Sequence, residues 1–377
     1  MKIHIAGDFC PRYRGVNECE QNNFEKSFGQ IATQLQEADY RIVNLECPVC
    51  SSDKSAILKM GPNLRCDEKS VKQIMKYLGF DCFTLANNHI MDYGRQGLLE
   101  TIEFCKRERF DYVGVGVTEK EAANILYKKI NGKTLAIINC CEFEFSIALD
   151  NESGANHLNI VHQYNSIKEA KAKADYVILI IHGGHEHWQL PSPRMVETYR
   201  FFIDAGADSI INHHQHCYSG YEVYKGKPIF YGIGNFFFDI SPVKTNDLWN
   251  YGYVVELNLE ESISFNIIPY RQCSFNPIIE VLEKDCFSDK ITELNNIILD
   301  RNKLSLYTND YYKTCCRESA IALEPIQNRY VNGLQYRRIL PLFRTTKGLR
   351  MLYNFILCEA HRDKLQYFLT HKISNQN

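Results

Sequence analysis

The stretch Asp208-Ser209-Ile210-Ile211-Asn212-His213-His214-Gln215-His216 joins a short apolar run to a cluster of polar side chains. A run rich in isoleucine that is bounded in this way predicts a buried β-strand. Four more apolar runs end in the same manner, at Asp8, at Glu46, at Asn87-Asn88-His89 and at His182. In open α/β sheets ligands bind at the carboxyl ends of the strands, so we expect these polar groups to meet at one edge. Acidic, amide and imidazole groups together are typical of a metal site.

Up to residue 275 the chain alternates strand patterns with helical patterns, which predicts an α/β protein. Helices are expected at residues 69–78 and 97–107, where apolar side chains recur at helical spacing. Strand pairs are expected at 123–127 with 133–139, at 221–224 with 228–231, and at 253–259 with 264–268. In the first pair, Asn131-Gly132 supplies the tight turn. So much antiparallel pairing beside parallel units predicts two mixed sheets packed together.

Residues 276–377 contain few strand patterns and are predicted to be mainly helical, most clearly at 294–299, 329–340 and 347–369. The end of this segment is basic and is interleaved with aromatic residues. Such a segment can bind an anionic membrane surface. The alternative is a helical appendage whose aromatic residues pack on the first domain and whose charges face water. We therefore divide the chain into a domain of residues 1–275 and a basic helical extension of residues 276–377.

Length and composition narrow the class of protein. A chain of 377 residues is longer than one hydrophobic core usually supports, and 45% hydrophobic with 23% charged residues is ordinary for a globular protein. The net charge of -2 gives no overall attraction to nucleic acid, so no such partner is expected. The start of the chain leaves no room for a signal peptide, and no apolar run approaches the length of a membrane span. We expect a cytoplasmic protein, peripheral at a membrane at most. Its 15 scattered cysteines are expected to be reduced and mostly buried.

The residues around Asp8, Glu46 and Asn88-His89 support a metal site to different degrees. Asp8 alone could be a helix N-cap. Glu46 is followed by Cys47-Pro48, and proline keeps the acid out of a helix, where its two oxygens can bridge two cations. Asn88 offers an amide oxygen, and His89, with an ordinary pKa near 6.5, could donate a proton to a leaving group. The alternative is a helix-capping asparagine with a histidine packed beside it.

Histidines dominate the last two strand ends. His182 precedes two glycines, which disfavour a helix and let the backbone pass close to a ligand. Glu186 is then expected to orient a metal-binding imidazole through a hydrogen bond to its other nitrogen. His214 and His216 are two residues apart, which in an extended loop puts both imidazoles on the same side as a metal clamp.

These motifs together resemble the CapA-type capsule and poly-γ-glutamate biosynthesis family over residues 1–240. The family is similar to the calcineurin-like metallophosphoesterases, which implies a four-layer α/β/β/α sandwich of two mixed sheets. The resemblance implies two divalent cations held by Asp8, Glu46 as the bridging acid, Asn88, His182, His214 and His216. It also implies His89 as the catalytic proton donor. Around these lie Asn87, Asp92, Glu186, His213 and Asn235.

The sequence departs from the family pattern at several positions. The phosphoesterase pattern begins Asp-x-His, whereas Cys10 stands in place of that histidine. Gly183 and Gln215 replace a common Trp and a common Pro. Family members often carry an N-terminal membrane anchor and act outside the cell, so the expected absence of an anchor means that an extracellular role is not carried over.

The pattern favours a metal-dependent hydrolase of the phosphoesterase type that acts in making a capsule or other surface polymer. Its substrate would be the polymer or a phosphorylated precursor, with a metal-activated water and His89 as general acid. Mixed nitrogen and oxygen ligands favour Mn, Fe or Zn over Ca. Two alternatives stay open: a non-catalytic polymer-binding or assembly factor of a capsule synthesis complex, and a hydrolase that cuts an amide such as a γ-glutamyl bond.

Overall fold

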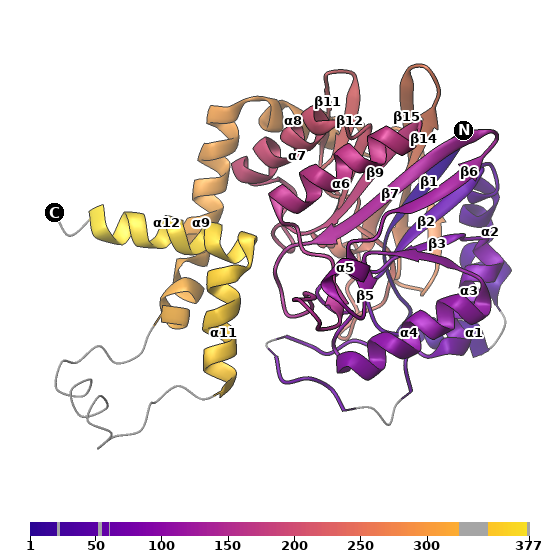
Figure 1. The fold of residues 1–377 in the computed structure, drawn as a ribbon, viewed down its shortest axis with the longest axis horizontal. Helices are drawn as coiled ribbons and strands as arrows, with labels where there is room; N and C mark the ends of the chain where they lie inside the picture. The colour runs from indigo at the N-terminus through magenta and orange to yellow at the C-terminus, as the bar shows by residue number, and fades with distance from the viewer. Residues whose placement is uncertain (21–22, 52–54, 60, 324–345, 375–377) are drawn as a thin grey trace.

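Two mixed β-sheets pack face to face and form the body of the molecule (Figure 1). The structure is a computed structural model that describes residues 1–20, 23–51, 55–59, 61–323 and 346–374. The first sheet has the order β16-β15-β14-β1-β2-β3-β4, and β13 pairs with β1. Its strands are β1 (Lys2–Cys10), β2 (Tyr40–Leu45), β3 (Cys82–Thr84), β4 (Asp111–Val113), β13 (Asn235–Phe238), β14 (Tyr251–Leu259), β15 (Ile263–Gln272) and β16 (Ile279–Val281).

The second sheet has the order β11-β12-β10-β9-β7-β6, and a small third sheet pairs β5 with β8. In the second sheet, the central strands β7, β9, β10 and β12 run parallel, while β6 and β11 pair antiparallel at its edges. The strands are β5 (Val115–Gly116), β6 (Leu126–Ile130), β7 (Lys133–Cys141), β8 (Gly154–Ala155), β9 (Tyr176–His182), β10 (Ser209–His213), β11 (Tyr221–Tyr224) and β12 (Lys227–Phe230). The predicted strand pairs are confirmed, and Asn131 and Gly132 both adopt the positive φ that the tight turn requires.

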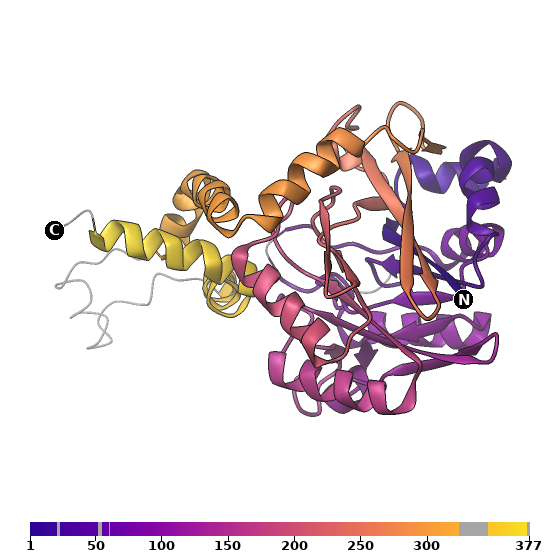
Figure 2. The same ribbon diagram turned by 90° about the horizontal axis from the view of Figure 1, so that it is seen from above.

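Helices cover the outer faces of both sheets (Figure 2). Alternate residues of β2 show the layering, because Ile42 packs between the sheets and Val43 packs toward the helices of the first sheet. The predicted four-layer sandwich is confirmed. The helices of the body are α1 (Arg14–Glu20), α2 (Phe24–Leu35), α3 (Glu68–Leu78), α4 (Gly94–Glu108), α5 (Glu119–Ala122), α6 (Ile160–Lys173), α7 (Pro193–Ala205) and the 3₁₀ helix η1 (Leu248–Asn250).

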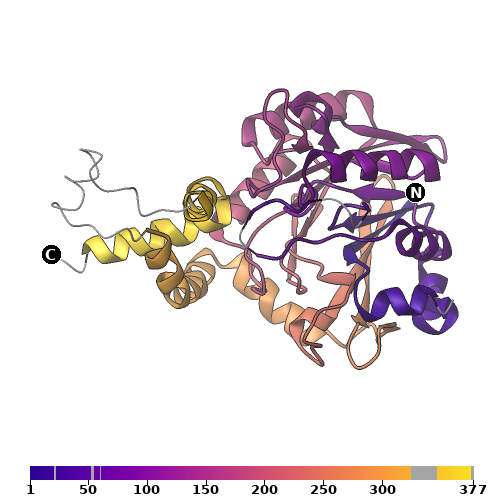
Figure 3. The same cartoon turned by 90° about the horizontal axis from the view of Figure 1, so that it is seen from below.

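The C-terminal part is helical, and its last three described helices lie at one end of the sandwich (Figure 3), whereas the first packs beside β11. It contains α8 (Ser288–Leu299), α9 (Arg301–Leu323), α11 (Thr346–Leu357) and α12 (Glu359–Ser374). The prediction of one helix over 347–369 is wrong, because the chain breaks at Cys358 into two helices. The long helix α9 is not among those predicted, and the helix expected at 329–340 lies outside the described residues. The boundary at residues 275 and 276 stays a prediction; β16 lies just beyond it and pairs with β15.

Two expectations from composition can be compared with the structure. The cysteines whose side chains are described form no disulfide with one another, and all of them except Cys286 are buried. Among the residues that the structure describes, none of the helices has the length and apolar character needed to cross a membrane.

Candidate metal centre

Asp8 lies within β1, next to a bulge in this strand, and not after the end of the strand. The expectation that this strand stops before Asp8 is wrong, because β1 continues to Cys10, and its pairing with β2 skips Gly7 between Ala6 and Asp8. The backbone N–H of Asp8 donates to the carbonyl oxygen of Gly234 at 3.1 Å. Gly7 makes this approach possible, since a Cβ there would lie 1.8 Å from the same oxygen. The bulge thereby turns the Asp8 carboxylate toward the other candidate ligands.

Glu46 lies one residue beyond β2, where its backbone N–H donates to the carbonyl oxygen of Phe9 at 3.0 Å. Its side chain is fully buried, and neither carboxylate oxygen has a hydrogen-bond partner among the described residues. A buried carboxylate without partners costs several kcal/mol in ordinary proteins. A cation between the side chains is the simplest way to satisfy it.

His214 and His216 converge for a different reason than the one we expect from sequence. The loop is not extended: His214 has φ 88° and His216 has φ 55°, both in the left-handed region. Non-glycine residues held there are strained, and such strain is concentrated at functional sites. The two turns direct both imidazoles toward Glu46.

The candidate ligands form two groups that share Glu46. In one group, Nε2 of His182 lies 3.6 Å from Oε1 of Glu46 and 3.1 Å from Nδ1 of His214. Asn88 adjoins this group, because its Oδ1 lies 3.1 Å from Nε2 of His182. In the other group, His216 lies 3.6 Å from Glu46 through Nε2 and 3.6 Å from Asp8 through Nδ1. The structure therefore brings together all six predicted ligands, and their donor atoms are close enough to hold divalent metal.

Burial sets the protonation of these groups before any cation binds. It raises the pKa of Asp8 to about 7 and holds that of Glu46 well above its usual value, with the nearby Asp8 charge adding to the effect at Glu46. Burial also lowers the pKa of His216 to about 3 and that of His182 well below its usual value. Both imidazoles are therefore neutral near pH 7 and free to bind a metal through nitrogen. The donor set of carboxylate, amide and neutral imidazole suits a divalent transition metal.

His89 lies beside the ligands in a hydrogen-bonded pair with Asp92. The distance from Nδ1 of His89 to Oδ2 of Asp92 is 2.6 Å. The buried Lys59 forms an ion pair with Asp92, and its Nζ also lies 3.1 Å from Nδ1 of His89. The carboxylate fixes the ring through Nδ1, which leaves Nε2 as the nitrogen that a substrate can contact.

The other predicted residues support the ligands, with one exception. Asn87 receives a hydrogen bond from the backbone N–H of His89 at 3.1 Å, and Asn235 lies 2.9 Å from Nδ1 of His216. The imidazole nitrogens of His213 are buried without a hydrogen-bond partner among the described residues, and Nδ1 lies 3.5 Å from Asp8, which makes His213 a further candidate ligand. Glu186 lines a cavity, and its carboxylate forms no hydrogen bond with an imidazole in the described part of the chain.

Some residues of the site are missed by the sequence patterns. Asn44 donates through Nδ2 to Oδ1 of Asp8 at 2.7 Å. It belongs to the stretch Asn44-Leu45-Glu46, so its place near the end of β2 could have indicated its role. Lys59 and Glu144 come from segments without a strand pattern. Glu144 accepts a hydrogen bond from Nδ2 of Asn88 at 3.1 Å, so it orients a candidate ligand.

A cavity of about 500 Å³ opens beside the candidate ligands. One side presents Asn88, His89 and His214. The opposite side comes from the C-terminal helices, with Tyr311, Thr314, Cys315, Asn354, Phe355, Cys358, Ala360, His361 and Lys364. Residues remote in sequence from the first domain thus enclose the candidate site.

Polar contacts hold the C-terminal helices at this cavity. Arg194 binds Glu142 at 2.7 Å and Asp363 of α12 at 2.9 Å. Glu359 lies 3.1 Å from His157, and His361 lies 3.5 Å from Glu144. The described part of the extension therefore packs on the first domain, but charged groups of α12 take part in the contact, whereas the predicted appendage had its charges facing water.

Metal loading is expected to strengthen as pH rises through about 7. Below the raised pKa of Asp8, a proton competes with the cation for the carboxylate. Because the pKa is higher in the folded than in the unfolded state, Asp8 costs the metal-free protein stability as pH rises from about 4 to 7, and a cation restores it. The increase in melting temperature caused by Mn²⁺ should therefore grow between about pH 5.5 and 7.5. An increase independent of pH would contradict this, and Asp8→Asn should weaken the dependence.

Comparison with known proteins decides the family. Residues 2–240 match the family model described as "Bacterial capsule synthesis protein PGA_cap". The chain belongs to this family. All of the predicted ligands lie within the matched residues, whereas α9, α11 and α12 lie beyond them.

Two curated relatives are identical to this PGA_cap member at about a third of the aligned residues. One is "Capsule biosynthesis protein CapA" of Bacillus anthracis, 32% identical over 278 residues that cover 71% of this chain and 66% of the relative. The other is "PGA biosynthesis protein CapA" of Bacillus subtilis (strain 168), 33% identical over 231 residues that cover 60% of each. The chain thus spans about two thirds or less of the length of these relatives.

Solved structures similar to this PGA_cap member include two described as 5'-nucleotidases. A putative 5'-nucleotidase from Staphylococcus aureus has 14% identity and a TM-score of 0.46, with 78% of this chain and 58% of that chain covered. A 5'-nucleotidase precursor from Thermus thermophilus has 12% identity and a TM-score of 0.45, with 78% and 57% covered.

Proposed function

We propose that this PGA_cap member is a metal-dependent hydrolase that cleaves a phosphoester, or a related bond, in the synthesis of a capsule or other surface polymer. The observation that carries the proposal is the fully buried carboxylate of Glu46, unpartnered among the described residues and shared by two groups of metal-ligand side chains. Its membership of the capsule synthesis family supports the polymer as the context. Mn, Fe or Zn fit the mixed nitrogen and oxygen donors.

Each residue has a distinct part in the proposed reaction. When bound, divalent cations lower the pKa of water and offset negative charge on a phosphoryl group. Asp8, Asn88, His182, His214 and His216 would hold the cations, with Glu46 between them. Nε2 of His89 would give a proton to the leaving oxygen, and Asp92 would stabilise the imidazolium before transfer.

The cavity favours an anionic substrate of moderate size. Lys364 and His361 of α12 line the cavity, and so do Glu144 and Glu186. His361 lies 3.5 Å from Glu144, so the ammonium group of Lys364 is the cation that would attract such a substrate. A volume of about 500 Å³ lies in the range of pockets for small molecules and admits a polymer end or a phosphorylated precursor.

Replacing both His214 and His216 with Ala tests the proposed function. The double variant should lose at least 10³-fold of turnover of an aryl phosphate, about 4 kcal/mol of transition-state stabilisation, together with its bound metal. Metal per chain would be measured by mass spectrometry and turnover by release of the phenol. The exposed His162 provides the matched control, and His162→Ala should retain both properties. A double variant that turns over at the wild-type rate would exclude the mechanism.

A non-catalytic assembly factor is the second candidate, and one observation favours it. Cys10 stands where the phosphoesterase pattern has a histidine, and the structure places its sulfur 3.7 Å from that of Cys66. A protein that binds no divalent metal and turns over neither an aryl phosphate nor a γ-glutamyl amide would match this candidate. Membrane contact through the basic tail and a cytoplasmic location also remain proposals, and liposome flotation of the full chain tests the first.

Lys364→Ala is expected to raise KM for an anionic substrate roughly tenfold and to leave kcat unchanged, because a charged hydrogen bond is worth about 1.5 kcal/mol or more. Steady-state kinetics with an aryl phosphate would measure both constants. Arg362, on the same helix and absent from the cavity wall, is the control. If Arg362→Ala and Lys364→Ala raise KM equally, the cavity wall does not select the substrate.

A further inference from the structure

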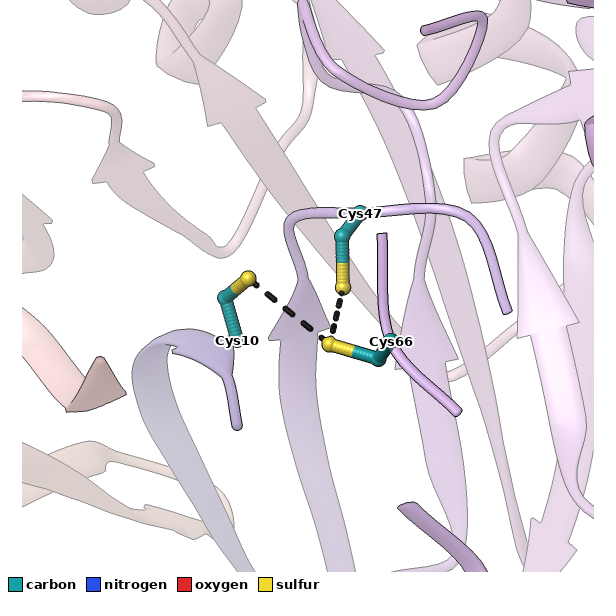
Figure 4. A group of neighbouring side chains, drawn as sticks. All are labelled: Cys10, Cys47 and Cys66. Carbon is teal, nitrogen blue, oxygen red and sulfur yellow. Dashed lines mark hydrogen bonds between the residues drawn. The ribbon is translucent and has the colours of Figure 1, made fainter. Parts of the chain in front are cut away.

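Three cysteine thiols meet near the candidate ligands: Cys10 lies two residues after Asp8, Cys47 follows Glu46, and Cys66 comes from a separate segment. Sγ of Cys66 lies 3.7 Å from Sγ of Cys10 and 2.9 Å from Sγ of Cys47 (Figure 4). All three sulfurs lie within 4.8 Å of one another and are buried. They come from separate segments: Cys10 ends β1, Cys47 follows β2 and Cys66 precedes α3.

Backbone hydrogen bonds fix these positions without help from the sulfurs. The N–H of Cys66 donates to the carbonyl oxygen of Pro48 at 3.0 Å, and the N–H of Cys50 donates to the carbonyl oxygen of Cys66 at 3.3 Å. Cys10 pairs with Phe238 in the first sheet. A ligand that binds the three sulfurs therefore meets a largely preorganised site, which lowers the entropic cost of binding.

The separations can be compared with those in metal thiolate sites. A metal–sulfur distance of about 2.3 Å places two bound sulfurs about 3.8–4.0 Å apart. The Cys10–Cys66 pair, at 3.7 Å, is already close to this value. The Cys47–Cys66 pair has to open by about 1 Å, which a modest side-chain rotation supplies. A disulfide needs about 2.05 Å, which neither pair shows.

We propose that Cys10, Cys47 and Cys66 form a binding site for a thiophilic metal ion. On binding, each thiol gives up one proton and forms one sulfur–metal bond, with no change of oxidation state. In the described part of the chain, no fourth histidine, cysteine or acidic ligand atom joins this group. Three sulfur donors match three-coordinate Cu⁺, whereas Zn²⁺ would need a fourth donor such as water.

The surface offers a path to this site. A cavity of about 380 Å³ is lined by Cys66 together with Arg12, Arg65 and Tyr93. Its two arginines favour delivery of the ion as an anionic thiolate complex. The metal would thus enter from a cavity separate from the one that presents His89 and His214.

Anaerobic titration of the reduced, chelator-treated full chain with Cu⁺ tests the proposal. The His214→Ala/His216→Ala double variant serves as the background, so that the histidine centre does not compete. We expect one Cu⁺ per chain with near-ultraviolet charge-transfer absorption, and at least a tenfold loss of affinity in Cys66→Ser. Cys82, a buried cysteine outside the group, is the matched control, and Cys82→Ser should bind Cu⁺ unchanged.

X-ray absorption of the copper-loaded background protein gives a result that does not depend on any cysteine variant folding. Three sulfur donors at about 2.3 Å around copper support the site, and three sulfurs with one oxygen donor in zinc-loaded protein would support it with the other ion. A shell of nitrogen and oxygen alone, equal affinity in Cys66→Ser, or a Cys47–Cys66 disulfide in protein isolated without reductant would overturn it. Because the readout is sulfur ligation, failure here leaves the proposed hydrolase untouched.

Discussion

Glu46→Gln is expected to abolish metal binding at both candidate positions and to leave the metal-free protein as stable as the wild type. Burial holds the pKa of Glu46 well above its usual value, so the metal-free wild type favours the neutral acid there. Glutamine has the same shape and is neutral, so the free energy of unfolding of the metal-free protein should not change. The cations lose the negative oxygen that both candidate groups share.

Calorimetry with and without Mn²⁺ would measure this effect. In the wild type, metal at 100 times its Kd should add about 2.7 kcal/mol of stability per site, and in Glu46→Gln that gain should vanish together with at least 10³-fold of kcat/KM. Glu256→Gln provides the contrast. Although burial opposes it, hydrogen bonds from Asn266 and His4 hold the pKa of Glu256 at about 2. That variant should lose stability and keep its metal. Two metal equivalents in Glu46→Gln would contradict the proposed centre.

His89→Gln is expected to lower kcat by about 10²- to 10⁴-fold without loss of metal, because it removes the proposed general acid. His89 is held by Asp92 at 2.6 Å and lines the cavity, but it belongs to neither group of candidate metal ligands. Turnover of an aryl phosphate at fixed metal content would measure the effect.

The leaving group distinguishes proton donation from a structural role. A dinitrophenyl ester leaves without needing a proton, so the defect of His89→Gln should shrink at least tenfold on that substrate. An equal defect on both esters would mean that His89 positions other groups. The matched control is His162→Gln on the exposed face of α6, which should hydrolyse either ester at the wild-type rate.

The strand pattern predicted which residues meet, because most of the candidate ligands directly follow a strand in the sequence. Parallel strands of one sheet end at the same edge, so Glu46 and Asn88 of the first sheet meet although the chain separates them. His182 ends β9 of the second sheet, and it joins them because the two sheets pack face to face. The pattern could not predict how each side chain is aimed. Asp8 depends on a bulge against Gly234, and His214 depends on a positive φ, both set by contacts distant in sequence.

The C-terminal wall of the cavity was beyond prediction for a similar reason. Helix α9 carries polar residues around most of its surface, so no apolar stripe marks it in the sequence. Its contact with the site depends on pairs such as Tyr312 with His185 at 3.0 Å, which join segments far apart. The buried Lys59 was missed likewise, because only its partner Asp92 explains its burial.

An anomalous-scattering map of crystals grown with Mn²⁺ tests most directly whether these side chains share cations. Two peaks should lie on either side of the Glu46 carboxylate, one next to Asp8 and His216 and the other next to His182 and His214. The absence of peaks there at saturating Mn²⁺, or peaks only at surface carboxylates, would contradict the metal centre.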